Sequence, residues 1–356
     1  MGLSIILLAG GEGTRMRSTK PKVLHKLAGK PLILHVYDAI SDASINADDI
    51  YIVYGNNKNL LQQVFENFEK FENHNSVDIN QKKAHERLNK ITWVEQKERL
   101  GTGHAVLQVL PKLNPEHQVL ILCADVPLIN KTTLKHFVDS TGKQELGLLT
   151  VHTEDPTGLG RIVRDDYYQV QEIVEERDAT EVQKQINEIN AGVYCVNAEH
   201  LKKWLPNLNS DNAQKEYYLT DIVKMAKAAK IAINVSEPVH IEEVYGVNNR
   251  SQLAKLERVY QQWQADKLLQ NGVTLLDPAR LDVRGDLQCG SDTVIDINTI
   301  FSGKVIIGKN CHIGANCILN NVVLQDGVTI LPNSMLDGSE VQSGASIGPY
   351  ARLRPG

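Results

Sequence analysis

A glycine-rich loop with two cations follows a short apolar run near the start of the chain. The run Leu3–Leu8 predicts a buried strand, and the residues after it read AGGEGTRMRSTKPK. Glycines let backbone N–H groups approach phosphate oxygens closely, because no Cβ intervenes. Arg15 and Lys22 add two positive charges that can neutralise a triphosphate. The combination favours a loop that binds a nucleoside triphosphate over an ordinary strand-to-helix turn.

This loop differs from two well-known phosphate-binding sequences. It lacks the G-x-x-x-x-G-K-[ST] pattern of a Walker A loop, and it lacks the third glycine of the dinucleotide fingerprint. A plainer interpretation of Arg15 and Lys22 is that both are solvated surface cations. The loop therefore predicts a nucleotide site outside these two classes.

The elements that position this loop follow from alternating apolar runs and amphipathic stretches. The strand-like runs are Leu3–Leu8, Ile50–Tyr54, Ile91–Val94 and Val119–Cys123, and the helix-like stretches are Pro31–Ala43, Asn56–Phe71 and Thr102–Leu110. This order predicts an α/β, Rossmann-like domain whose mostly parallel sheet is covered by helices on both faces. Ligands of such sheets bind beyond the carboxyl ends of the strands, where the glycine loop and Asp125 fall.

The composition is that of a globular protein and excludes several function classes. The chain has 356 residues, of which 42% are hydrophobic and 23% charged, and its net charge of −5 disfavours nucleic-acid binding. No apolar run approaches the ~20 residues that span a bilayer, and the apolar start is too short for a signal peptide. Five cysteines without a C-x-x-C pair argue against a disulfide framework or a zinc knuckle. We therefore expect a cytoplasmic protein with neither nucleic-acid nor membrane partners.

Two later segments have their own patterns. Apolar residues at helical spacing predict one long helix over Asn248–Gln270, either a connecting arm or a final helix of the sheet domain. The polar stretch Glu72–Lys90 is interpreted as an insertion between elements. Both segments are expected to separate regions of regular structure.

From about residue 294 a six-residue repeat begins. One series runs through Val305, Cys311 and Cys317, and a second through Ile307, Ile313 and Leu319. After a slip of one residue, we expect the period to continue through Val322, Val328, Ser334, Glu340 and Ser346. Hexapeptide repeats are typical of a parallel β-helix. The two cysteines are then inward-facing stacking positions rather than metal ligands.

Several motifs occur in a fixed order along the chain. They are LLAGGEGTRM at 7–16, KPK at 20–22, GTGHA at 101–105, DPTGLGR at 155–161, NEINAG at 187–192, NAQKEYYLTD at 212–221, GVNNR at 246–250 and RLRPG at 352–356. Together they resemble the bacterial N-acetylglucosamine-1-phosphate uridyltransferases over nearly the whole chain. In that family an acetyltransferase module follows on the same polypeptide.

The resemblance implies a division of the chain into three parts. It predicts a uridyltransferase domain at 1–247, a linker helix at 248–271 and the start of a left-handed β-helix at 272–356. The acetyltransferase site of the family lies beyond Gly356, so the chain is expected to be truncated and to lack acetyl transfer. The β-helices of the family associate as homotrimers, which is the expectation here.

The resemblance also implies a reaction. UTP and N-acetylglucosamine 1-phosphate would give UDP-N-acetylglucosamine and pyrophosphate, for peptidoglycan and lipopolysaccharide precursors. Attack of a phosphate oxygen on the α-phosphorus needs no general base, so positioning and charge neutralisation by Arg15, Lys22 and Mg²⁺ would carry catalysis. His104 is interpreted as a residue packed under the loop rather than as a base.

Binding residues are implied in the same way. The nucleotide residues would be Leu8, Ala9, Gly10, Gly11, Lys22, Gln96, Gly101 and Thr102. The sugar residues would be Cys123, Ala124, Asp125, Gly160, Glu175, Asn190, Tyr218, Thr220 and Asn248. Asp125 and Asn248 would bind Mg²⁺, and Arg354 would belong to the acetyltransferase substrate site. Each of three residues also has a plainer interpretation from the local sequence. Asp125 would be a turn residue before Pro127, Asn248 would be a helix N-cap, and Glu175 would be a surface carboxylate.

Three positions depart from the family's pattern. Cys123-Ala124 replaces a common Tyr-Gly, Glu12 stands where a lysine is frequent, and Ala191 replaces a common threonine. Two alternative functions remain open at this point. One is a nucleotidyltransferase for glucose or mannose 1-phosphate, and the other is a regulatory relative that binds nucleotide sugars without turnover.

Overall fold

The chain folds into two compact units. The structure, a computed structural model, describes residues 2–42, 44–75 and 90–355. The first unit, here called the sheet unit, comprises Met1–His25 and Leu32–Asn249, and the second, the coil unit, comprises Lys26–Pro31 and Arg250–Gly356. The three-part division expected from the sequence stays a proposal. The short segment 26–31 belongs to the coil unit, although sequence order places it inside the sheet unit.

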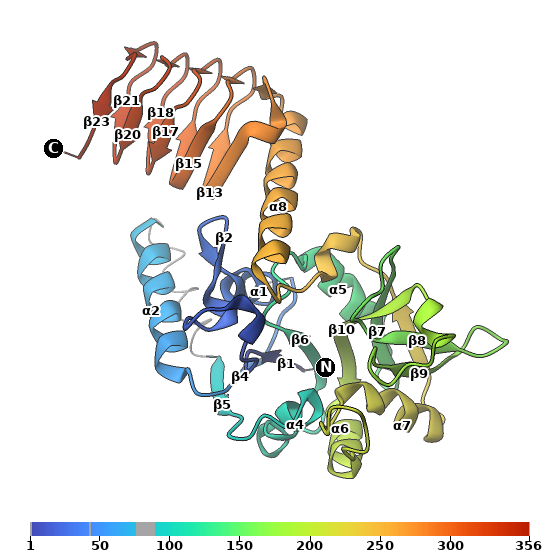
Figure 1. Cartoon of the computed structure of the whole chain (residues 1–356). Helices are drawn as coiled ribbons and strands as arrows, with labels where there is room; N and C mark the ends of the chain where they lie inside the picture. Colours follow the sequence, from blue (N-terminus) through green and yellow to red (C-terminus); the bar gives the residue numbers. More distant parts are fainter. Residues whose placement is uncertain (1, 43, 76–89, 356) are drawn as a thin grey trace. The chain divides into compact units, whose positions relative to one another are not determined.

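A mostly parallel sheet forms the centre of the sheet unit (Figure 1). Its strands are β1 (Leu3–Leu8), β4 (Asp49–Tyr54), β5 (Ile91–Glu95), β6 (Gln118–Cys123), β7 (Leu146–His152), β8 (Arg161–Arg164), β9 (Val170–Val174), β10 (Glu188–Asn197) and β11 (Ile233–Ser236). They pair in the order β11-β7-β10-β6-β1-β4-β5, while β8 pairs with β10 and β9 pairs with β8. Strand β10 runs antiparallel to β6 and β7, whereas β1 is parallel to β4 and β6. The predicted fold class is confirmed, and the four predicted strands match to within one residue.

Helices cover both faces of this sheet, as predicted. They are α1 (Leu32–Ile40), α2 (Lys58–Asn75), α4 (Thr102–Leu107), α5 (Lys131–Ser140), α6 (Ala198–Trp204) and α7 (Ile222–Ala228). Successive side chains of β1 point to opposite faces. Ile5 and Leu7 therefore pack in one core with α1, α2 and α5, while Ile6 packs in the other with α4, α6 and α7. Two buried layers hold β1 in place, and with it the start of the glycine loop.

Several predicted helix limits need correction. Helix α1 ends at Ile40, α2 continues to Asn75, and α4 ends at Leu107, before Pro111, which lies in a short 3-10 turn. Most of the predicted insertion Glu72–Lys90, residues 76–89, lies outside the described residues. The long helix α8 (Arg250–Gln270) begins two residues later than expected, after Asn248.

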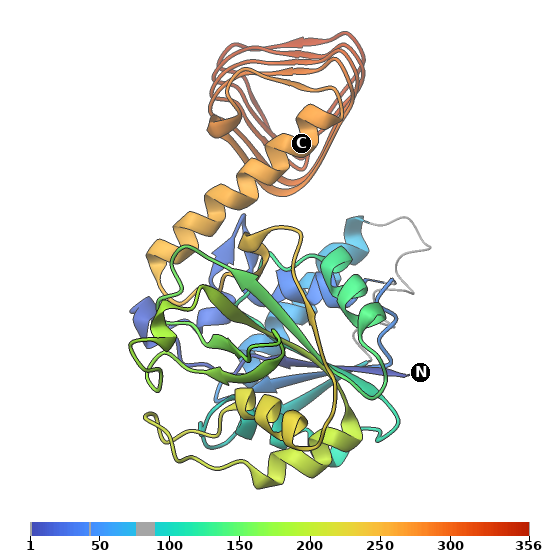
Figure 2. The same ribbon diagram turned by 90° about the vertical axis from the view of Figure 1, so that its right-hand side faces the viewer.

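In the coil unit, a parallel β-helix follows α8. Its strands are β12 (Thr274–Leu275), β13 (Leu281–Cys289), β14 (Val294–Ile295), β15 (Thr299–Ile307), β16 (His312–Ile313), β17 (Ile318–Asn320), β18 (Val323–Leu324), β19 (Thr329–Ile330), β20 (Met335–Asp337), β21 (Glu340–Val341), β22 (Ser346–Ile347) and β23 (Arg352–Leu353). All pair in parallel with the next coil, and Figure 2 shows the stacked coils as a triangle. An antiparallel pair, β2 (Lys26–Leu27) with β3 (Lys30–Pro31), completes this unit. Left-handedness stays a prediction from the resemblance.

The length of one coil changes along the β-helix. In the first coils Leu281 pairs with Thr299 and Ile300 with Ile318, a spacing of 18 residues or three full hexads. In the later coils Ile318 pairs with Met335 and Val323 with Glu340, a spacing of 17 residues, so each later coil is one residue shorter. The expected inward positions Cys311 and Cys317 are buried.

The last two inward positions predicted from the six-residue period, Glu340 and Ser346, are wrong because the later coils have 17 residues. Glu340 and Ser346 are exposed, because a second one-residue slip precedes them. The buried positions at this level are Leu336 and Val341, which belong to the other inward series. The predicted period includes one slip only, whereas the stacking requires one in each 17-residue coil.

Candidate active site

A hollow of about 500 Å³ lies at the carboxyl edge of the sheet. The residues that line it come from the ends of β1 and β6, from the segment between β5 and α4, and from the loop before α7. They are Leu8, Gly10, Gly11, Glu12, Lys22, Val23, Gln96, Arg99, Gly101, Thr102, Ala105, Cys123, Asp125 and Glu216. Most residues implied for nucleotide binding thus share one cavity. Ala9 does not line it, because its N–H donates to the carbonyl of Val53 within the sheet, 2.8 Å away.

The buried Lys22 lies between two oxygen ligands. Its Nζ donates to Asp125 Oδ2 and to Asn248 Oδ1, the latter at 3.0 Å. A backbone hydrogen bond of 2.8 Å, from Val247 N to the carbonyl of Asp125, holds the two segments together. Two oxygens from distant parts of the sequence therefore converge on one positive charge. Carboxylate and amide oxygens are also ligands that suit Mg²⁺.

Glycines allow the loop to pack closely over Lys22. Gly13 adopts φ 64°, a left-handed conformation, and a Cβ there would lie 2.5 Å from Lys22 Cβ. A Cβ at Gly10 would lie 3.1 Å from Gln96 Oε1. Arg15, in the turn Thr14–Met16, is exposed and does not line the hollow. Of the two implied catalytic cations, the structure brings only Lys22 into the cavity.

Gln96 forms the side of the hollow near α4. It is buried, and its Nε2 donates to the carbonyl of Gly101 at 3.0 Å. His104 contacts Gln96 through Nδ1 at 3.3 Å and Gln108 through Nε2 at 3.1 Å. Thr102 Oγ1 accepts from Leu219 N at 3.1 Å. The contacts of His104 agree with a packing role rather than that of a base.

A second cluster gathers sugar residues implied by the resemblance. Thr220 Oγ1 donates to Glu175 Oε1 at 3.4 Å, and a Cβ on Gly160 would lie 3.6 Å from the Glu175 carboxylate. Asn190 N donates to the carbonyl of Gly160 at 2.9 Å. The phenol of Tyr218 donates to Asp178 at 3.2 Å. Within the sheet unit, Gly160, Glu175, Asn190 and Thr220 thus lie together, although they do not line the hollow.

Burial raises the pKa of the Glu175 carboxyl above its ordinary value of 4.5, and the charges of Asp178, Asp221 and Glu216 act in the same direction. The folded chain therefore holds this proton to a higher pH than the unfolded chain does. Between those two pKa values the folded state binds more protons, so its stability falls as pH rises.

Replacing Glu175 with glutamine removes this dependence. We expect the variant to be more stable than the unmodified chain at pH 7.5, and the difference to shrink toward pH 4.5, as measured by urea unfolding. Glu176→Gln is the matched control of opposite sign, because its hydrogen bond with Arg161 lowers the pKa of Glu176. A Glu175→Gln effect that does not depend on pH would contradict this account.

Two charged residues that line the hollow are not predicted from the sequence. Arg99 and Glu216 both line it. Arg99 stands two residues before Gly101 on the segment that carries Gln96, and this spacing was the available signal. Nothing in the local sequence marked Glu216.

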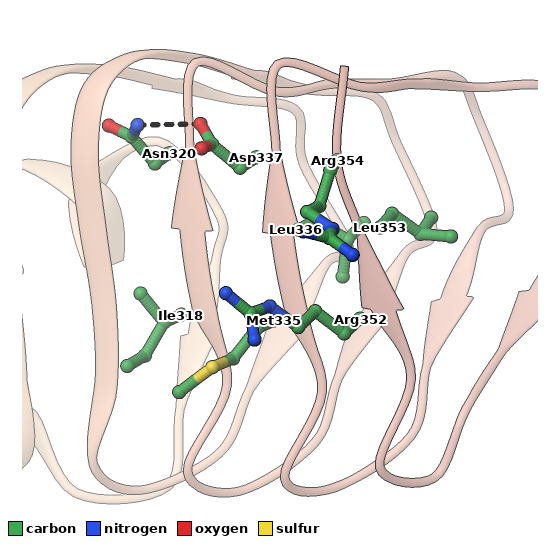
Figure 3. A pocket seen from close by; sticks show the side chains of 8 residues that line it. All are labelled: Ile318, Asn320, Met335, Leu336, Asp337, Arg352, Leu353 and Arg354. Atoms are coloured by element: carbon green, nitrogen blue, oxygen red, sulfur yellow. Dashed lines mark hydrogen bonds between the residues drawn. The ribbon is translucent and has the colours of Figure 1, made fainter. Parts of the chain in front are cut away.

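Arg354 lies in a separate hollow on the coil unit. Figure 3 shows it there with Arg352, Met335 and the hydrogen-bonded pair Asn320 and Asp337. The residues come from three stacked coils, β17, β20 and β23. The role that the resemblance implies for Arg354 stays a prediction.

Comparisons with known proteins place the chain among nucleotide-transferring enzymes. Residues 4–247 match the family described as "Nucleotidyl transferase". The "Bifunctional protein GlmU" of Francisella philomiragia subsp. philomiragia is 48% identical over 355 residues, which cover 100% of this chain and 73% of that protein. The protein of the same name from Marinobacter nauticus is 45% identical over 354 residues, covering 99% of this chain and 73% of that one.

Solved structures add support for the fold. Two structures of UDP-glucose pyrophosphorylase, one with UDP-glucose and one in the apo form, align with TM-scores of 0.57 and 0.58. Each covers 74% of this chain and 100% of its own, at 18% sequence identity. This likeness shows the fold alone. Among the described residues, no helix combines the length and apolarity that crossing a membrane requires.

Proposed function

The chain belongs to the GlmU family of nucleotidyl transferases, and from this premise we propose that it transfers uridylyl from UTP to N-acetylglucosamine 1-phosphate. The products are UDP-N-acetylglucosamine, a precursor for peptidoglycan synthesis, and pyrophosphate. The observation that carries the proposal is the buried Lys22 at the carboxyl edge of the sheet, beneath a glycine loop and in contact with Asp125 and Asn248.

The chain's own groups supply position and charge. The attacking atom is already an anionic phosphate oxygen, so no residue need remove a proton. Lys22 neutralises charge at the reacting phosphates, and the glycine loop admits them close to its backbone N–H groups. Gln96 presents its amide, held by the Gly101 carbonyl, to the uracil edge. Glu175 and Asn190 bind the acceptor sugar.

Asp125 and Asn248 suit a divalent cation. An oxygen of each contacts the ammonium of Lys22, and this convergence supports a shared cation site. Two protein oxygens suit Mg²⁺, which commonly keeps phosphate oxygens and water as its other ligands. When bound there, Mg²⁺ would offset the negative charge of the phosphates. The homotrimer and the cytoplasmic location stay predictions from the sequence.

Pyrophosphate release tests the proposal directly. The chain is incubated with UTP, Mg²⁺ and either N-acetylglucosamine 1-phosphate or glucose 1-phosphate. We expect release with the acetylated sugar to exceed that with glucose 1-phosphate by about tenfold or more, because a site that hydrogen-bonds the N-acetyl group would have polar groups without partners when that group is missing.

Two outcomes would contradict the proposal. Faster release with glucose 1-phosphate would identify a different sugar-phosphate nucleotidyltransferase. Binding of UTP without release from either sugar would indicate a regulatory relative.

A further inference from the structure

An ion pair lies in the lining of the nucleotide hollow. Arg99, after β5, pairs through Nη1 with Oε1 of Glu12 in the glycine loop. Both residues line the hollow. The ion pair therefore joins two of the segments that the bound nucleotide would have to contact.

The two partners differ in how firmly they are held. The guanidinium of Arg99 lies against the backbone after β4, since a Cβ on Gly55 would be 3.1 Å from its Nη2 and 3.2 Å from its Nε. The Arg99 side chain is 30% exposed, whereas that of Glu12 is 58% exposed. Glu12 is thus the more exposed partner and the one that can move into solvent more easily, while Arg99 is the more firmly held one.

The charges around the hollow are nearly balanced. Its lining has two cations, Lys22 and Arg99, and three carboxylates, Glu12, Asp125 and Glu216. Each cation contacts one carboxylate, Lys22 with Asp125 and Arg99 with Glu12. A triphosphate that enters this hollow meets no unpaired cation in its lining. One of these ion pairs must therefore separate before its cation can neutralise the phosphates.

We propose that Arg99 binds phosphate, and that the phosphates of the bound nucleoside triphosphate displace Glu12 from Arg99. This inference rests on the proposed function, since it takes UTP as the ligand. The planar guanidinium of arginine binds phosphate oxygens through two parallel hydrogen bonds, which a carboxylate partner mimics. Glu12 therefore competes with the phosphates for Arg99, and the pair sets the affinity for nucleotide.

The proposal predicts effects of opposite sign for the two partners. Arg99→Gln removes the phosphate contact and should weaken UTP binding by about tenfold or more. Glu12→Gln removes the competitor and should tighten UTP binding about two- to fivefold, the range expected for a partly exposed ion pair. Arg99→Lys keeps the charge but loses the paired geometry, so it should fall between Arg99→Gln and the unmodified chain.

Equilibrium binding to the full chain tests these signs. The ligands are UTP, uridine and inorganic triphosphate, measured by calorimetry with Mg²⁺ present. Arg99→Gln should affect UTP and triphosphate and leave uridine unchanged. Lys97→Gln is the matched control, because Lys97 is an exposed cation on the same segment and its loss should change UTP affinity less than twofold. Thermal unfolding without nucleotide verifies that each variant folds.

The outcomes separate the two proposals. Failure of the unmodified chain to bind UTP would overturn the proposed function. If UTP binds normally but Arg99→Gln binds it equally well, Arg99 does not contact phosphate and the inference is wrong. Weaker binding by both Glu12→Gln and Arg99→Gln would also overturn it, since the ion pair would then only brace the two loops.

Discussion

Replacing Lys22 with alanine is expected to lower the rate of uridylyl transfer by about 10²- to 10³-fold, the usual cost of removing one donor that faces developing charge. The same change should tighten the binding of a divalent metal to the chain without nucleotide. The reason is competition, because the Lys22 ammonium contacts both Asp125 and Asn248, the two oxygens that a metal would use.

The gain in metal affinity should be on the order of tenfold, since a hydrogen bond to a charged group contributes about 1.5–3 kcal/mol. Titration with Mn²⁺, followed by the electron paramagnetic resonance signal of the free ion, measures it without any turnover. Lys20→Ala is the control, because Lys20 is an exposed cation two residues away and should change neither quantity. Equal or weaker Mn²⁺ binding by Lys22→Ala would mean that Lys22 and the metal do not share this position.

Replacing Leu319 with alanine is expected to destabilise the coil unit by about 2–5 kcal/mol, the usual cost of truncating a fully buried leucine. Leu319 is 0% exposed in the core of the coils, and that core contains no residue of the sheet unit. Uridylyl transfer at 25 °C should therefore be unchanged. Chemical unfolding followed separately for each unit, beside an activity assay, measures both effects.

Met335→Ala is the matched control for Leu319→Ala. Met335 lies one coil further on, paired opposite Ile318 beside Leu319, and is 49% exposed, so its truncation should cost less than about 0.5 kcal/mol. Loss of uridylyl transfer in Leu319→Ala would show that the sheet unit depends on the coil unit for its own stability. That result would overturn the expectation of two independent cores.

The sequence pattern was sufficient to predict the buried strands of the sheet and the coils of the β-helix. The apolar runs of β1 and β6 identify buried strands because a strand covered on both faces has no polar side. The six-residue period identifies the coils because each inward residue must repeat with each strand. The 17-residue coil was missed because the second slip becomes visible only when Val323 is paired with Glu340.

The active site was less accessible to sequence reasoning, because its contacts join loops far apart in the chain. The position of Lys22 beside Asp125 depends on how η2 (Lys22–Leu24) meets the end of β6. The pairing of Arg99 with Glu12 likewise requires two loops to meet, and neither loop specifies the other. The exposure of Arg15 depends on the direction of a single turn, for which the sequence offers no signal.

The small hairpin at 26–31 affects how this chain can be dissected. Ala28 N donates to Glu257 on α8 at 2.6 Å, and Leu27 is fully buried, so the hairpin is part of the coil unit although it follows η2 directly. The polypeptide passes between the two units three times rather than once. A protease cut or a gene boundary after residue 249 would therefore not yield two intact halves. The first fragment would keep six residues of the coil unit, and the Ala28 amide would lose its partner Glu257.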